Sequence, residues 1–224
     1  MADYGIRVIG SHGAVQVDQD HKNLELRAKA TVATTTNYPG TTSVSTVDVT
    51  YTGPHPLMAL RCAVNATILR QTISGSTWTF QIVVDGIIGT SVDYWIFDEP
   101  DNAAPSGYGV VVFDENEEVT FNSNKKYIRV VDFFTDNDYD PDTRTYTSGR
   151  TYGFIPVFSA YRWQQFNLPD NFYQELEWTY GGRNATNGVQ FQTMIVRSEV
   201  LAGQISEQLV EYNYGFIVID LTDI

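Results

Sequence analysis

The chain has few of the residues on which disulfide, zinc and nucleophilic chemistry depend. Its 224 residues include one cysteine and three histidines. A lone Cys62 excludes an intrachain disulfide and fits folding in a reducing compartment, and its apolar neighbours predict a small buried side chain. His12, His21 and His55 lie in turns or beside proline, without a zinc-binding spacing, a nucleophile elbow or a glycine-rich phosphate loop nearby. We therefore predict no catalytic residue, no metal ligand and no cofactor.

Basic residues and long apolar runs are also scarce. The chain has 14 Lys and Arg against 27 Asp and Glu, a formal net charge of -13. Such a surface repels the phosphates of nucleic acid and of anionic membranes. No apolar run approaches the ~20 residues that a membrane span needs. The opening residues MADYGIRVIG lack the basic and apolar regions of an export signal. We expect a protein that folds in the cytoplasm, without membrane insertion or nucleic-acid binding.

The residues that are abundant favour strands. Aromatic residues make up 13% of the chain, and strong helix formers are scarce. Segment 77–84 alternates strictly, with Trp78, Phe80 and Ile82 on one face and threonine or glutamine between them. The sequence predicts an all-β fold. Short helical turns are expected only within 168–179 and 199–209.

One pattern occurs twice in the chain. Tyr4–Arg27 and Tyr108–Val131 align at a constant offset of 104 residues, and the aligned positions keep their apolar character: Ile6 with Val110, Val8 with Val112, Val15 with Val119, Val17 with Phe121, Leu24 with Ile128 and Leu26 with Val130. The pattern predicts a strand, turn, strand, loop, strand unit used twice. Tyr214–Asp220 repeats only its first strand.

A linker is expected between the two copies. Segment 99–107 contains two prolines, Gly, Ser and Asn, and no apolar residue larger than Ala. We predict two β-sandwich-like domains built on the duplicated three-strand unit: an N-terminal domain over 1–98 and a C-terminal domain over 108–224.

Aromatic residues cluster between positions 163 and 180 among Gln, Asn and Gly. This mixture suits stacking on sugars or a protein interface. The candidate contact residues are Trp163, Tyr173, Trp178 and Tyr180, with Phe166 and Phe172 nearby. The alternative is that a β-sandwich buries these rings in its core.

Acidic residues give two weaker candidates. The run Asp136–Asp142 places carboxylates at alternate positions, as a calcium loop does, but has Pro141 where that loop needs Gly and Thr147 where it needs Glu. A solvated acidic loop is the alternative. A second group of acidic residues offers paired carboxylates for glycoside cleavage: Asp98, Glu99, Glu115, Glu117 and Glu118. The alternative is that these are the acidic turns common in any acidic protein.

The second copy resembles a group of small structural proteins of tailed bacteriophages encoded among the tail genes. That group carries a Tyr-Gly-x-x-Val-x-Asn/Asp strand, a Phe-Asp/Asn-Ser element and an apolar Arg-Val-Val strand. The matching segments are Tyr108–Asp114, Phe121–Ser123 and Tyr127–Asp132, with Tyr94–Asp98 and Phe216–Asp220 also similar. The N-terminal copy departs from the pattern, because it has Val17-Asp18-Gln19 at the second element.

The resemblance implies a non-enzymatic virion component of the distal tail, baseplate or tail fibre region that supports or mediates host attachment. Its partners would be other tail proteins, further copies of itself in a trimer or ring, and a host surface glycan or protein. Two alternatives stay open: a carbohydrate-binding β-sandwich that uses the aromatic cluster, and a head decoration protein.

Overall fold

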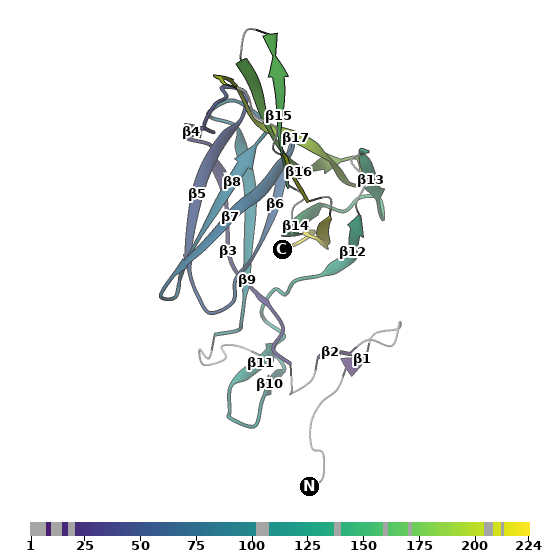
Figure 1. Cartoon of the computed structure of the whole chain (residues 1–224). Coiled ribbons are helices and arrows are strands. Elements are labelled where there is room, and N and C mark those ends of the chain that lie inside the picture. Colours follow the sequence, from purple (N-terminus) through teal and green to yellow (C-terminus); the bar gives the residue numbers. More distant parts are fainter. Residues whose placement is uncertain are drawn as a thin grey trace.

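The computed structural model describes residues 8–9, 15–17, 21–101, 108–136, 140–158, 161–169, 172–203, 208–211 and 213–224. They form an all-β fold of packed antiparallel sheets, which confirms the predicted sandwich-like class (Figure 1). Strand β8 (Thr77–Val84) illustrates why the sequence forms strands with one buried face. Phe80 and Ile82 are fully buried while Thr77 and Thr79 are not, so the alternation in the sequence becomes one buried and one more open face.

One sheet has six strands in the order β12-β19-β14-β6-β9-β3. Their bounds are β3 Glu25–Ala33, β6 Leu57–Cys62, β9 Ser91–Asp98, β12 Val130–Asp136, β14 Tyr152–Phe158 and β19 Tyr214–Asp220. All neighbouring pairs are antiparallel, including the central pair β6 and β14, where Leu60 faces Phe154.

The second sheet follows the order β13-β17-β16-β7-β8-β5-β4; β15 also pairs with β16, and β18 pairs with β15. The bounds are β4 Thr36–Asn37, β5 Ser45–Thr52, β7 Ala66–Ser74, β13 Asp142–Thr145, β15 Tyr161–Leu168, β16 Phe172–Ala185, β17 Gly188–Ala202 and β18 Gln208–Glu211. At its centre β7 meets β16 through Ala66 and Gly182.

The predicted repeat folds as the same hairpin twice, β1 (Val8–Ile9) with β2 (Val15–Val17) and β10 (Val111–Phe113) with β11 (Val119–Asn122). Val8 pairs with Val17 as Val112 pairs with Phe121, and Ile9 pairs with Val15 as Phe113 pairs with Val119. Both hairpins have a register shift at the same place. The third strands, β3 and β12, start within one residue of equivalent positions and form the two outer strands of the six-stranded sheet.

The duplication continues beyond this unit. β3 pairs with β9 across a bulge between Leu26 and Ala28, and β12 pairs with β19 across a bulge between Val130 and Asp132, which is the same place shifted by 104 residues. In both halves a hairpin of the second sheet follows in chain order, β7–β8 and β16–β17. The order β3-β9-β6 from one edge of the six-stranded sheet therefore corresponds to the order β12-β19-β14 from the other edge.

The two halves nevertheless share one core. Each sheet continues from the first half into the second through one strand pair: β6 with β14 in the six-stranded sheet, and β7 with β16 in the second sheet. We call these two pairs the seam. The main cluster of buried side chains includes Phe80 and Ile82 from the first half and Phe154, Phe191 and Phe216 from the second. The predicted boundary at 99–107 thus divides the two copies along the sequence. The two copies do not have separate cores, because strands pair across the seam. Of the linker, 102–107 lie outside the described residues.

Helical turns were expected within 168–179 and 199–209. Pro169 is in a 3-10 conformation, but 172–179 belong to β16, 199–202 to β17 and 208–209 to β18; residues 170–171 and 204–207 lie outside the described residues. Each of these strands pairs along its length with a neighbour, which overrides weak local signals for helix. The acidic loop after β12 also contains a strand, β13, which pairs with β17.

Candidate functional site

The aromatic cluster lies in a projecting part of the second sheet that we call the arm. It consists of β15, the first part of β16 (172–179), the end of β17 (194–202) and β18. Figure 1 shows it extending from the end of the molecule opposite to the β10–β11 hairpin. Because successive side chains of a strand point to opposite faces, the pairing register assigns each arm residue to one of two faces.

The first face carries the charged residues of the arm. Arg197 lies 3.0 Å from a carboxylate oxygen of Glu175, 3.2 Å from Glu177 and 2.7 Å from Glu199. Glu175 and Glu177 are buried, and the hydrogen bond with Glu199, together with the charges of the other two glutamates, holds the pKa of Arg197 above its usual value. Gly40 packs so closely on Glu199 that a Cβ there would overlap its side chain. The ion pairs hold the two hairpin strands of the arm together, and the Gly40 contact places this face against the loop before β5.

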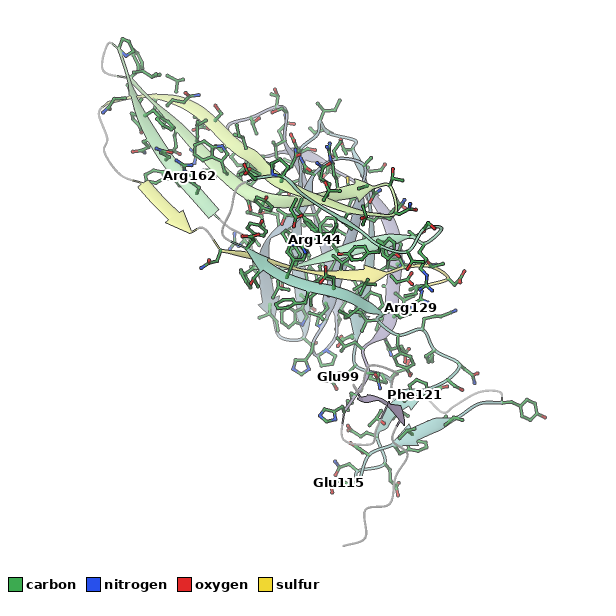
Figure 2. The ribbon with its side chains drawn as sticks, turned by 90° about the vertical axis from the view of Figure 1, so that its right-hand side faces the viewer. Glu99, Glu115, Phe121, Arg129, Arg144 and Arg162 are labelled. Carbon is green, nitrogen blue, oxygen red and sulfur yellow. The ribbon has the colours of Figure 1, made fainter. Side chains whose placement is uncertain are left out.

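The second face, which we call the open face, is apolar. It comprises Arg162, Gln164, Phe166 and Leu168 of β15, Phe172, Gln174, Leu176 and Trp178 of β16, and Ile195, Ser198, Val200 and Ala202 of β17. Phe172 is 43% exposed, Ile195 48% and Val200 60%. Its single charge is on Arg162, which is labelled on the arm in Figure 2. Arg162 lies over the Trp178 ring at 5.1 Å from the centroid, and Phe166 meets that ring edge-on with the ring centroids 6.5 Å apart.

The structure separates the four predicted contact residues. Trp178 lies on the open face, whereas Trp163 pairs with Glu177 and lies on the charged face. Tyr173 is on the charged face too and only 8% exposed. Tyr180 is fully buried, stacks on Tyr214 and donates a hydrogen bond to the carbonyl oxygen of Asp140. The predicted surface as a set is thus corrected, because alternation places Trp163 and Tyr173 on the face opposite to Trp178, and packing against the other sheet buries Tyr180.

Sequence reasoning missed the apolar members of the open face, above all Leu168, Leu176, Ile195 and Val200. The alternation of Phe172, Leu176 and Trp178 was a signal for a strand. The expectation of a helical turn over the same residues obscured it.

A second exposed apolar stretch lies on the outer strand β12. Val130 is 57% exposed, Val131 42% and Phe133 56%. The equivalent outer strand β3 carries Arg27 and Lys29 at the positions matching Val131 and Phe133. Charged side chains on an edge strand discourage pairing with another chain, and exposed apolar ones do not. The two edges of the six-stranded sheet are therefore unequal.

The β10–β11 hairpin is joined to the first half by ion pairs. Lys22 lies 2.9 Å from Glu99 and 2.7 Å from Glu118 of the hairpin, and Lys125 lies 2.9 Å from Glu25. The hydrogen bond from Lys22 holds the pKa of Glu99 below its usual value. The backbone N–H of Asn23 also donates to Thr120. Figure 2 shows Phe121 and Glu115 at this end of the molecule, far from Arg162 on the arm.

The carboxylates considered for glycoside cleavage have other roles. Asp98 is buried and accepts hydrogen bonds from the backbone N–H groups of His55 and Glu99. Glu99 and Glu118 share Lys22, and Glu115 and Glu117 are exposed in the hairpin turn. The geometry brings no pair of them to a common cleft.

Two depressions on the described surface lack a group of catalytic side chains. One of about 260 Å³ lies between β7, β14 and β16 and has no titratable lining residue: Ile68, Leu69, Gln71, Pro156, Val157, Phe158 and Thr179. A second, of about 570 Å³, has Asp136 as its one carboxylate.

Among the described residues, no group of His, Cys, Asp and Glu has the arrangement of a metal site. Of the acidic run, 137–139 lie outside the described residues, as does His12. Asp142 pairs with Arg144 at 2.6 Å.

Comparisons with known proteins found no matching protein family, no matching curated protein and no matching solved structure. Within the described ranges there is also no helix with the length and apolar character to cross a membrane.

Proposed function

We propose that this chain is a non-enzymatic structural subunit of a bacteriophage virion, located in the distal tail, baseplate or fibre region, where it supports or mediates host attachment. The sequence resemblance to tail-encoded structural proteins motivates the location. The observation that carries the structural role is where exposed apolar side chains gather: on the open face of the arm and on the edge strand β12. Both are places at which sheets join other sheets.

Four of the five segments that carry the resemblance lie in the second half, and the fifth, Tyr94–Asp98, lies in β9 of the first half. Tyr108–Asp114 and Phe121–Ser123 include the β10–β11 hairpin, Tyr127–Asp132 leads into β12, and Phe216–Asp220 is the neighbouring strand β19. A motif that specifies a hairpin and a sheet edge is a scaffold motif, since none of its residues forms a catalytic constellation. Folding in the host cytoplasm before assembly completes the proposal.

Gold-labelled antibody against this protein, applied to intact purified particles of the encoding phage and viewed by negative stain, tests the proposal. Label at the distal tail is the expected result. Label on the head would instead indicate a decoration protein. Absence from extensively purified virions, with the protein free in the lysate, would refute a virion role.

A further inference from the structure

We propose that the open face of the arm is a self-association surface, on which the same face of a second copy packs sheet against sheet. This inference deepens the proposed function and rests on it in taking the chain to be an assembly subunit. It names the occupant of the arm as a second copy of this chain.

The open face is a continuation of the inner face of the sandwich. Tyr180 and Gly182 point into the core between the two sheets, and Trp178, Leu176 and Phe172 follow on the same side of β16. Burial falls along this row: Tyr180 is fully buried, Trp178 is partly buried and Phe172 is 43% exposed.

The opposing sheet ends where this row becomes exposed. Tyr214, the first residue of β19, stacks on Tyr180 with ring centroids 3.9 Å apart. Beyond that contact no described strand of the six-stranded sheet covers the arm. A sheet with one apolar face is stable when another layer buries that face. The open face of the arm is apolar like the inner face of the sandwich, but no second layer covers it.

The distribution of charge favours a second copy as that layer. The chain carries a net charge of -13, so two copies repel each other over most of their surfaces. The open face contains no carboxylate, and its one charge, Arg162, stacks on Trp178. Glu175, Glu177 and Glu199 of β16 and β17 lie on the opposite face, where they pair with Arg197. Two acidic copies can therefore meet here without bringing carboxylates together.

The size of the face indicates the strength of the contact. Three strands of about seven residues cover roughly 23 Å by 15 Å, given ~3.3 Å per residue and ~4.8 Å between strands. This is smaller than the ~800 Å² per partner of a standard interface. We therefore expect a reversible, concentration-dependent association in solution, which neighbouring contacts would reinforce in an assembly.

Sedimentation velocity of the full chain from ~1 to ~200 μM tests the proposal, with three variants beside the wild type. Val200→Glu and Phe172→Glu each place a carboxylate on the open face. Ile73→Glu is the matched control, because Ile73 is 56% exposed, similar to Val200 at 60%, but lies at the end of β7 away from the arm. Near-ultraviolet circular dichroism and thermal melts establish that each variant is folded.

The expected result is a concentration-dependent dimer for the wild type and for Ile73→Glu, with the dissociation constant raised at least tenfold in both open-face variants. A second measurement uses Val200→Cys and Ile73→Cys. Since Cys62 is buried, oxidation should cross-link only the copy with an open-face thiol.

A wild type that stays monomeric at 200 μM would overturn the proposal, and so would equal weakening by Ile73→Glu. Neither outcome touches the virion role, which the antibody labelling tests separately. Conversely, a dimer through the arm in a protein absent from virions would leave this inference standing and remove the proposed function.

Discussion

Tyr180 and Tyr214 stack almost parallel, with an interplanar angle of 12° and ring centroids 3.9 Å apart. They join the long hairpin strand β16 to the first residue of β19, at the point where the two-layered core ends and the arm begins. Burial, with the neighbouring Tyr214 hydroxyl, raises the pKa of the Tyr180 phenol, so this hydroxyl stays protonated throughout the neutral range.

Tyr214→Ala should destabilise the protein by about 3–5 kcal/mol, because it leaves a cavity among large buried rings. Equilibrium urea unfolding measures this loss. Ile73→Ala, at an exposed site, is the comparison and should change the free energy of unfolding by less than about 0.5 kcal/mol. Similar effects for the two variants would mean that the stack does not close the core.

Gly182→Ala should also destabilise the protein, by about 1–3 kcal/mol, because a Cβ at this position would lie 2.9 Å from three atoms of the buried Phe154 ring. Gly182 faces Ala66 across the seam, so this substitution tests whether the two halves depend on close packing there. Denaturant unfolding is again the measurement.

Gly75→Asn provides the control for that substitution. Gly75 has φ +64 and open space around it, and Asn tolerates this conformation, so little change is expected. An unchanged midpoint for Gly182→Ala would contradict the tight seam.

The attachment of Lys22, which bridges Glu99 and Glu118 of the β10–β11 hairpin, should weaken as the pH falls. The pKa of Glu99 is lower in the folded chain than its ordinary value of 4.5, chiefly through the hydrogen bond from Lys22. A lowered carboxyl pKa stabilises the fold above the ordinary pKa, and this stability is lost as the pH drops through the folded value. Hydrogen exchange of the Asn23 amide, which donates to Thr120, should therefore accelerate relative to core amides below about pH 4.5.

Lys22→Met should produce the same local loosening at neutral pH while changing global stability by no more than about 1 kcal/mol, since its ion pairs are partly exposed. Lys29→Met serves as the matched charge removal outside the network. If both variants leave the exchange of Asn23 unchanged, the ion pairs do not hold the hairpin.

Cys62 should react with a thiol reagent only after unfolding. It is 2% exposed, and burial raises the pKa of its thiol. In native buffer the labelling rate should match the global unfolding rate, and in urea it should become immediate. Rapid native labelling would show that β6 opens locally.

How much of this structure the sequence predicts depends on the range of the interactions. The alternation of 77–84 and the doubled pattern at an offset of 104 residues depend on neighbours along the chain, so they predicted the all-β class and the repeated hairpin with its following strand. Burial of Cys62 followed from its apolar neighbours in the same way.

Long-range pairing decided the rest. The antiparallel contacts Leu60 with Phe154 and Ala66 with Gly182 merge two predicted domains into one core, and no local pattern marks those partners. The aromatic cluster depended on the same kind of information. Strand pairing over 172–202 replaced the expected helical turns. Alternation then placed Trp163 on the face opposite to Trp178 and Tyr180, and the other sheet buried Tyr180 while leaving Trp178 partly exposed. The sequence by itself determined the all-β class and the hairpin with its following strand that forms twice; the tertiary structure decided the strands of the arm and which faces are left open, because exposure depends on what packs opposite each strand.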